Sequence, residues 1–197
     1  MSLNILLIQG SLHQQSATAA MIQFVKEEIQ KLGAEVNLLD LRKFEIPHYN
    51  PDTAKETDAY KKLKPLVDEA DAYILGTPDY HGTPSGPLKN FLDYFWHEFS
   101  GKLFGYVCAS HEKGLLPMET LRTAVRQCYG WSLPYGVSGL DEQEINSEGK
   151  ITGEKLKNRL TMLAHDSVTY GKILKEQRQK DLARKEPGFL ASLRIAN

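Results

Sequence analysis

The chain has 197 residues, of which 41% are hydrophobic and 25% are charged, and its formal net charge is −1. This composition is typical of an ordinary globular protein, and the length fits one domain with a substantial core. The near-zero charge argues against a nucleic-acid-binding protein, and no apolar stretch is long enough to span a membrane. The beginning of the sequence lacks a secretory signal pattern, so we expect a cytoplasmic protein.

The cysteines and histidines give no sign of a disulfide or a metal centre. Cys108 and Cys128 both lie in apolar patterns, so we expect buried free thiols, as is usual in a reducing compartment. No pair of histidines or cysteines has the close spacing of metal ligands. The sequence therefore predicts no metal site.

Short apolar runs alternate with helical patterns along the chain. The predicted strands are residues 5–9, 35–39, 72–76, 103–109 and 132–137, and the predicted helices are residues 16–32, 58–70, 87–99, 117–129 and 152–177. Strict alternation of this kind predicts an α/β protein of three layers, a parallel sheet with helices on both faces. Five strands match the doubly wound order 2-1-3-4-5, in which ligands bind outside the carboxyl ends of strands one and three.

The first strand runs into a loop rich in hydroxyl groups, residues 10–16 (GSLHQQS), and then into a helix. The N-terminus of a helix offers unpaired N–H groups and a positive dipole end to an anion. Ser11, Ser16 and Thr18 add hydroxyl donors there. The loop lacks the lysine of a nucleoside-triphosphate loop and the glycines of a dinucleotide fingerprint, so it suits one terminal phosphate. A helix capped by Ser16 with nothing bound is the alternative.

The segment after the third strand, residues 76–93, contains three prolines and three glycines. These residues fix a rigid backbone path, and Tyr80 and His81 supply flat rings. Such a loop suits a planar heterocycle, and a stiff connection into a helix is the alternative. In the order 2-1-3-4-5 this loop faces the first one. A phosphate site opposite a site for a flat ring predicts a bound mononucleotide.

Two features of the helix predicted at residues 87–99 allow more than one interpretation. Its aromatic side chains are more numerous than one face of a modest helix needs, so we expect either core packing or an exposed face used in a dimer. Lys89 and Asp93 stand four residues apart, a spacing typical of a surface ion pair rather than an acid–base pair. The aromatic residues are Phe91, Tyr94, Phe95, Trp96 and Phe99.

The end of the chain departs from the β-α pattern. We expect a domain over residues 1–176 and an extension over residues 177–197, which has a charged stretch followed by an apolar one. This extension is either a frayed tail or an arm that docks on its own body or on a neighbouring subunit.

The two loops together resemble those of the NAD(P)H-dependent FMN reductase family, which includes flavodoxin-like flavin, quinone, azo-dye and chromate reductases. That family carries the motifs G-S-x-R-x-x-S and P-x-Y-x-x-x-x-x-G-x-L-K-N-x-L-D. This chain has GSLHQQS at residues 10–16 and PDYHGTPSGPLKNFLD at residues 78–93. Asp40-Leu41 followed by Ile46-Pro47 is also similar to the family's segment after strand two. The resemblance covers about residues 4–175.

The resemblance implies bound FMN that accepts a hydride from NADPH or NADH at its N5 and passes electrons to a quinone, azo compound, free flavin or similar small molecule. It implies a homodimer or a tetramer, and no covalent catalytic residue. Backbone N–H groups of residues 78–82, rather than the carboxylate of Asp79, are expected to face N5 and O4. The implied FMN-binding residues lie in three loops: Ser11, His13, Ser16, Ala17 and Thr18 at the phosphate; Pro78, Asp79, Tyr80, His81 and Gly82 around the ring; and Ser110 and His111 at the polar edge of the ring.

This chain departs from the family pattern at two positions. His13 stands where the family has arginine, so a permanently charged fork is replaced by a side chain that gains charge only towards acidic pH. Residues 109–114 (ASHEKG) stand where family members often have a Gly-Gly turn. An electron carrier of the flavodoxin kind, or an FMN-binding sensor without NAD(P)H turnover, is therefore the alternative to an enzyme.

Overall fold

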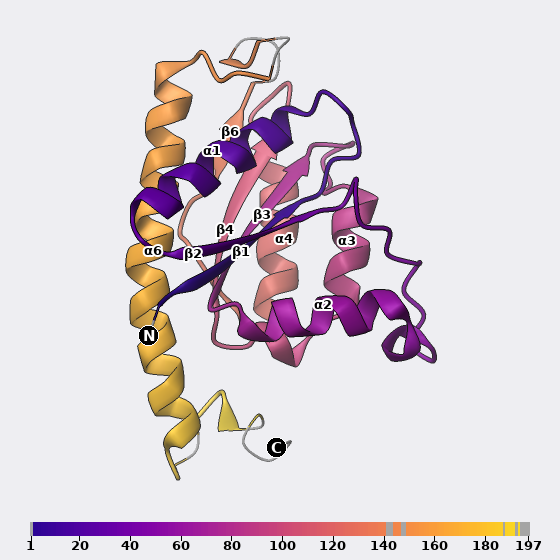
Figure 1. The fold of residues 1–197 in the computed structure, drawn as a ribbon, viewed down its shortest axis with the longest axis vertical. Helices are drawn as coiled ribbons and strands as arrows, with labels where there is room; N and C mark the ends of the chain where they lie inside the picture. Colours follow the sequence, from indigo (N-terminus) through magenta and orange to yellow (C-terminus); the bar gives the residue numbers. More distant parts are fainter. Residues whose placement is uncertain (1, 141–143, 147–148, 187, 192, 194–197) are drawn as a thin grey trace.

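The computed structural model describes residues 2–140, 144–146, 149–186, 188–191 and 193. Within these residues a six-stranded parallel sheet has the order β2-β1-β3-β4-β5, and β6 also pairs with β4 (Figure 1). The predicted doubly wound order is therefore confirmed. The strands are β1 (Asn4–Gln9), β2 (Glu35–Asp40), β3 (Ala72–Pro78), β4 (Leu103–Ala109), β5 (Trp131–Ser132) and β6 (Val137–Gly139).

The fifth predicted strand, residues 132–137, is divided in the structure. β5 pairs with the start of β4 and β6 with its end, and residues 133–136 leave the ladder between them. Pro134 has no N–H group to donate to a neighbouring strand, which accounts for the interruption.

Helices cover both faces of the sheet, as predicted (Figure 1). Ile5 and Leu7 of β1 pack with α1 and α6, whereas Leu6 and Ile8 pack with the helices of the opposite face. This alternation produces two apolar layers with the sheet between them. The helices are α1 (Ala17–Lys31), α2 (Asp58–Glu69), α3 (Gly86–Asp93), α4 (Leu115–Gln127) and α6 (Glu154–Ala183), with short 3₁₀ helices η1 (Ala54–Glu56) and η2 (His97–Phe99).

The helix predicted at residues 87–99 is shorter in the structure, where α3 ends at Asp93 and η2 follows. The backbone of Trp96 leaves the helical conformation, with φ −137° and ψ −76°. Most of the aromatic side chains enter the core, and only Trp96 is largely exposed, at 53%. Core packing thus accounts for Phe91, Tyr94, Phe95 and Phe99, which form a connected group of rings.

The polar pair of α3 forms an ion pair as expected, whereas only one of the two thiols is fully buried. Lys89 Nζ lies 2.6 Å from Asp93 Oδ1 on the surface of α3, as expected for an ion pair. Cys108 is buried as predicted, but Cys128 is only partly buried, and both thiols are free. Burial raises the pKa of Cys108 to about 12 and that of Cys128 to about 11, so neither is a reactive thiolate at neutral pH.

Two further classes of feature are absent from the described residues. No cluster of three histidine, cysteine or carboxylate side chains there could hold a metal ion. No helix in the same part of the chain is both long and apolar enough to cross a membrane.

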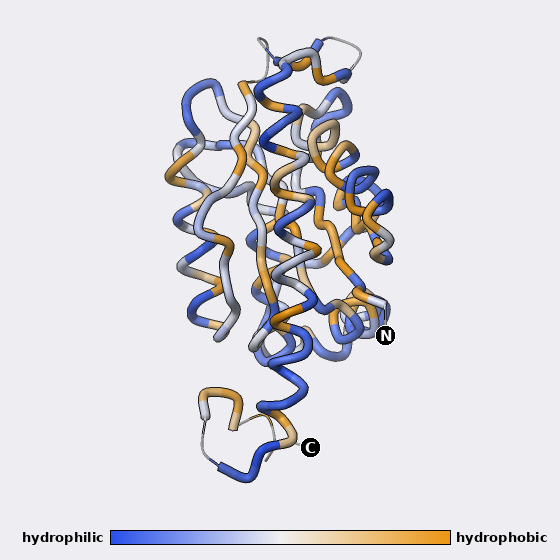
Figure 2. Tube along the Cα trace, turned by 90° about the vertical axis from the view of Figure 1, so that its left-hand side faces the viewer, coloured by the Kyte–Doolittle hydropathy of each residue, from blue (hydrophilic) through white to orange (hydrophobic). Residues whose placement is uncertain are grey.

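The last helix is longer than predicted, because α6 continues to Ala183. A division of the chain at residue 176 therefore falls inside α6. The last turns of α6 project beyond the body of the molecule (Figure 2). Leu190 is buried beside Gly101, and the Phe189 ring lies edge-on to Trp131 at 5.9 Å between ring centroids. Residues 187, 192 and 194–197 of the predicted extension lie outside the described residues.

Candidate functional site

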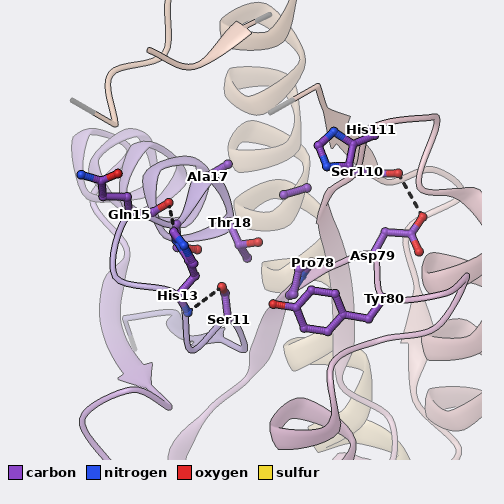
Figure 3. A pocket seen from close by; sticks show the side chains of 12 residues that line it. Ser11, His13, Gln15, Ala17, Thr18, Pro78, Asp79, Tyr80, Ser110 and His111 are labelled. Carbon is purple, nitrogen blue, oxygen red and sulfur yellow. Dashed lines mark hydrogen bonds between the residues drawn. The ribbon is translucent and has the colours of Figure 1, made fainter. Parts of the chain in front are cut away.

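A pocket of about 230 Å³ opens at the carboxyl ends of the strands, between the loops that follow β1, β3 and β4 (Figure 3). All of the residues predicted from the sequence to contact FMN line it except His81 and Gly82, which belong to the same loop as Tyr80 but do not line the pocket. Gln15 and Ala109 line it as well and were not predicted. The topology thus brings together three loops that are up to 100 residues apart in the chain.

Gln9, the last residue of β1, fixes the loop that follows the strand. Gln9 is buried, and its Nε2 donates to Ser11 O at 2.9 Å and to Asp40 Oδ1 at 3.2 Å. Its Oε1 accepts the Ser11 N–H group. The loop backbone is thereby fixed before any ligand arrives.

Arg42 holds the same loop from the side of β2. Its guanidinium group pairs with Asp40 at 2.6 Å and donates to His13 O at 3.4 Å and Gln14 O at 3.2 Å. Burial by itself would raise the pKa of Asp40, but hydrogen bonds from Arg42 outweigh it and hold that pKa below its usual value. Sequence reasoning missed Arg42 and Gln9, although Asp40 belongs to the family-like segment after strand two.

The first turn of α1 presents unsatisfied donors to the pocket. Ser16 Oγ caps the helix by accepting the Ala19 N–H at 3.1 Å, whereas the N–H groups of Ala17 and Thr18 have no acceptor in the described part of the chain. Thr18 is 1% exposed, and its Oγ1 is buried without a partner among the described residues. A buried hydroxyl without a partner is costly. This set of donors fits an anionic ligand at the helix N-terminus.

His13 is positioned by two contacts inside its own loop (Figure 3). Its N–H donates to Ser11 Oγ at 3.3 Å, and its Nδ1 lies 2.9 Å from Gln15 O. Because a carbonyl oxygen only accepts, Nδ1 carries the proton in this contact. The other ring nitrogen, Nε2, can then donate to an anion only when the imidazole is protonated.

The loop after β3 is a tight turn stabilised by Asp79. Tyr80 and Thr83 exchange backbone hydrogen bonds of 3.1 Å, and His81 and Gly82 adopt positive φ angles of 57° and 76°. The Asp79 carboxylate accepts the Gly82 N–H at 2.8 Å and the Ser110 hydroxyl at 3.0 Å. Both carboxylate oxygens of Asp79 therefore already accept hydrogen bonds from the protein.

These contacts leave few free N–H groups on the ring side of the pocket. The N–H groups of Asp79, Tyr80 and Gly82 are already hydrogen-bonded, and Pro78 has none. His81 supplies the only N–H of residues 78–82 that lacks an acceptor within the described chain. The expectation of several free N–H groups in this segment therefore reduces to one.

The loop after β4 is tied to its neighbours in the same way. The Ser110 N–H donates to Gly139 O at 3.1 Å, and Ser110 Oγ accepts the Glu112 N–H at 3.1 Å while it donates to Asp79. The hydroxyl of Ser110 is thus occupied in joining two loops. His111 is exposed at the mouth of the pocket.

Comparisons with known proteins agree with this geometry. A family model described as NADPH-dependent FMN reductase matches residues 3–144. The chain is 32% identical over 145 residues to the FMN-dependent NADPH-azoreductase of Staphylococcus saprophyticus, covering 69% of this chain and 76% of that protein. It is 28% identical over 184 residues to the NADPH azoreductase of Bacillus sp. strain OY1-2, covering 90% of this chain and 98% of that protein.

Solved structures show the same fold at lower identity. The NAD(P)H:(acceptor) oxidoreductase FerB of Paracoccus denitrificans superposes with a TM-score of 0.73 at 19% identity, covering 86% of this chain and 97% of that one. A WrbA-like flavodoxin from Agrobacterium tumefaciens gives a TM-score of 0.61 at 17% identity, covering 88% and 99%. The fold is therefore flavodoxin-like.

Proposed function

Since this chain belongs to the NADPH-dependent FMN reductase family, we propose that it holds FMN in the pocket between the three loops and uses NADPH to reduce a small aromatic acceptor. FMN and NADPH are the cofactors of this family. The observation that carries the assignment of the pocket is the buried, unpartnered hydroxyl of Thr18 beside the free N–H groups of the first turn of α1.

The donors of the first loop and of α1 suit the phosphate of FMN. Ala17 and Thr18 would donate through their N–H groups and Thr18 also through Oγ1, while protonated His13 would donate through Nε2. Ser11 and Ser16 line the same end of the pocket. Ser16 also caps the helix, and Ser11 Oγ accepts from the His13 N–H, so part of their role is to fix the donors in place.

The loops after β3 and β4 suit the ring. FMN, when bound, supplies reversible hydride and electron transfer. Tyr80 is 49% exposed and offers a flat apolar wall. The His81 N–H, which lies next to the pocket rather than in its lining, is the donor that this loop leaves free for the heteroatoms of the ring. Asp79 joins the two loops by accepting hydrogen bonds from Gly82 and Ser110. His111 lies at the polar rim of the pocket. None of these residues needs to transfer a proton, because positioning two rings face to face is the main requirement.

The mouth of the pocket favours flat, apolar acceptors. Leu116 at the start of α4 is 68% exposed and lies beside the loop after β3, since a Cβ atom at Gly82 would lie 3.2 Å from its Cδ1. Leu116 and Tyr80 together offer an apolar surface beside the pocket, which suits an aromatic ring. Azo dyes and quinones share that character, and the relatives described above are named azoreductases.

The acceptor is tested by following NADPH oxidation by the FMN-loaded protein with an azo dye, a quinone and free FMN in turn. We expect turnover with the azo dye and the quinone. Reduction of the protein by a separate reductase, with no turnover by NADPH, would instead identify an electron carrier. Stable FMN binding without reduction by either would identify a sensor.

We propose that the protein is a homodimer in the cytoplasm, with a tetramer as the alternative assembly. The free thiols of Cys108 and Cys128 suit a reducing compartment. Light scattering coupled to gel filtration measures the assembly directly, and a monomer at micromolar concentration would contradict the proposal.

A further inference from the structure

A second cavity lies beside the first, on the other side of the loop that follows β4. It has a volume of about 540 Å³ and lies at the sheet edge formed by β5 and β6, between α4 and the start of α6. His111 lines the first pocket, and the next residue, Glu112, lines the second cavity. The Cα atoms of Ser110 and Lys113 are three virtual bonds apart, at most about 11 Å. One elongated ligand can therefore reach both cavities.

Basic side chains from three elements surround this second cavity. Lys113 comes from the loop, Arg122 from α4, and Lys155 and Arg159 from consecutive turns of α6. Two carboxylates also line it, and one of them, Glu144, already accepts the Leu140 N–H through Oε2 at 3.0 Å. Among the described residues that line the cavity, cations outnumber carboxylates, so the local charge of this part of the chain favours an anion.

The two arginines are held in place, whereas no carboxylate of the described residues pairs with either lysine. Arg122 forms an ion pair with Glu119 and lies over the Tyr106 ring at 5.3 Å from its centroid. Arg159 Nη2 donates to Gly136 O at 3.2 Å, which leaves its other N–H groups available. Neither Lys113 nor Lys155 has a carboxylate within ion-pair distance among the described residues.

A buried hydroxyl marks the inner wall. Ser138 lines the cavity, and its Oγ is buried without a hydrogen-bond partner in the described part of the chain. A Cβ atom at Gly114, the N-cap of α4, would lie 2.8 Å from that oxygen. Because α4 begins just after Gly114, the positive end of the helix dipole lies close to this wall. No side chain caps this end of the helix.

The remaining walls are apolar and include an aromatic ring held in place. Leu115, Met118 and Pro134 supply apolar surface. The Tyr135 hydroxyl donates to Asp166 Oδ2 at 2.6 Å, which fixes its ring beside the cavity. Apolar walls next to a group of cations suit a flat base that carries phosphate groups.

We propose that this second cavity binds the adenosine 2′,5′-bisphosphate half of NADPH, with Lys155 and Arg159 at the 2′-phosphate. The inference rests on the proposed function, because a nicotinamide that reduces FMN must reach the flavin ring at the first pocket. NADH carries no 2′-phosphate and cannot make these contacts. The two α6 side chains therefore set a preference for NADPH over NADH.

Direct binding tests the cavity without turnover. Calorimetry of the FMN-loaded protein with 2′,5′-ADP and with 5′-AMP should show about tenfold tighter binding of 2′,5′-ADP. The substitutions Lys155→Gln and Arg159→Gln should each remove most of that difference. Lys157→Gln is the matched control, because Lys157 lies on the same helix and pairs with Glu154 outside the cavity. Equal binding of the two nucleotides to the wild-type protein would overturn the proposal.

Kinetics distinguish a lost phosphate contact from a distorted fold. In Lys155→Gln and Arg159→Gln, kcat/KM for NADPH should fall about tenfold while that for NADH stays nearly constant. Arg159→Lys, which keeps the charge, should recover much of the loss. An equal fall with both nucleotides, or 2′,5′-ADP inhibition that competes with the acceptor rather than with NADPH, would refute the assignment.

The two proposals fail separately. If NADPH does not reduce the wild-type protein but 2′,5′-ADP binding still depends on Lys155, the proposed function is wrong and the cavity assignment stands. If NADPH and NADH reduce the protein equally well in every variant, the proposed function stands and the cavity assignment is wrong.

Discussion

The side chain of Thr18 is arranged for a ligand in a way that destabilises the protein when no ligand is bound. Its hydroxyl is buried in the first turn of α1 and has no hydrogen-bond partner in the described residues. An unmet buried hydroxyl destabilises a fold by about 1–3 kcal/mol. A phosphate oxygen of FMN would meet this need, so the same atom that weakens the free protein would strengthen the complex.

Thr18→Val keeps the shape of the side chain and removes the hydroxyl. We expect the FMN-free variant to be as stable as the wild type or more stable, by up to about 1 kcal/mol, and its Kd for FMN to rise about tenfold. Urea unfolding without FMN and a fluorescence titration with FMN measure the two effects. Thr120→Val is the matched control, since the Thr120 hydroxyl is exposed and bonded to Leu116 O. Unchanged FMN affinity in Thr18→Val would contradict the assignment.

His13→Arg tests the one departure from the family pattern in the first loop. Nδ1 of His13 is engaged by Gln15 O, so only the protonated ring can donate to a phosphate through Nε2. Arginine donates at every pH. The variant should bind FMN several-fold more tightly than the wild type. A fluorescence titration with FMN measures both Kd values, and equal values would show that the side chain at position 13 does not contact the phosphate.

The packing of α1 on β3 sets the position of the pocket. Helix α1 reaches the edge of the sheet because Gly76 of β3 lets it approach closely. A Cβ atom at Gly76 would lie 2.6 Å from Ile22 Cγ1 and 3.1 Å from Thr18 Cγ2. Close packing of α1 on β3 thereby places the first turn of α1 opposite the loop after β3.

Gly76→Ala should destabilise the protein by about 1–3 kcal/mol, because the added methyl group overpacks the contact with Ile22. Urea unfolding measures the effect. Gly86→Ala is the control, because nothing lies within 4 Å of a Cβ atom there and the position begins α3. Equal stability of Gly76→Ala and the wild type would show that α1 can move away without cost.

The elements could be predicted from the sequence because their signals are local. Apolar runs and helical periodicity gave the order of the sheet, and Ser16 and Gly33 gave the two ends of α1. The interruption at Pro134 and the early end of α3 depend on how the chain packs, so they escaped prediction. Arg42 escaped prediction for the same reason, because the residues that it contacts, His13 and Gln14, are 29 and 28 positions earlier in the sequence. The direction of the Asp79 carboxylate likewise depends on Ser110, which only the folded chain brings near.

A buried lysine stabilises the end of the molecule opposite the pocket. Lys102 is 3% exposed, and its Nζ donates to Val67 O at 2.8 Å and Asp68 O at 3.0 Å, at the end of α2. Arg178 of α6 donates to Ser100 O at 2.9 Å. Burial, followed by the charge of Arg178, lowers the pKa of Lys102 from 10.5 to about 7.

This depressed pKa predicts a pH-dependent stability. Between about pH 7 and 10.5 the unfolded chain holds a proton on Lys102 that the folded protein has released, so the free energy of unfolding should rise with pH in this range. Lys102→Met should remove that rise, which for a pKa shift of this size is at most about 5 kcal/mol. Urea unfolding at several pH values measures it, with Lys61→Met, an exposed lysine, as the control. Parallel curves for wild type and Lys102→Met would contradict the prediction.

We propose that the three loops at the carboxyl edge of the sheet hold an FMN that NADPH reduces. The most direct measurement is the visible absorbance of the protein titrated with FMN to saturation and then mixed with NADPH in the absence of air. We expect one FMN to bind per chain, the flavin absorbance to be lost on addition of NADPH, and the absorbance to return when an azo dye or quinone is added. A protein that takes up no FMN, or whose bound FMN keeps its absorbance in excess NADPH, would contradict this proposal.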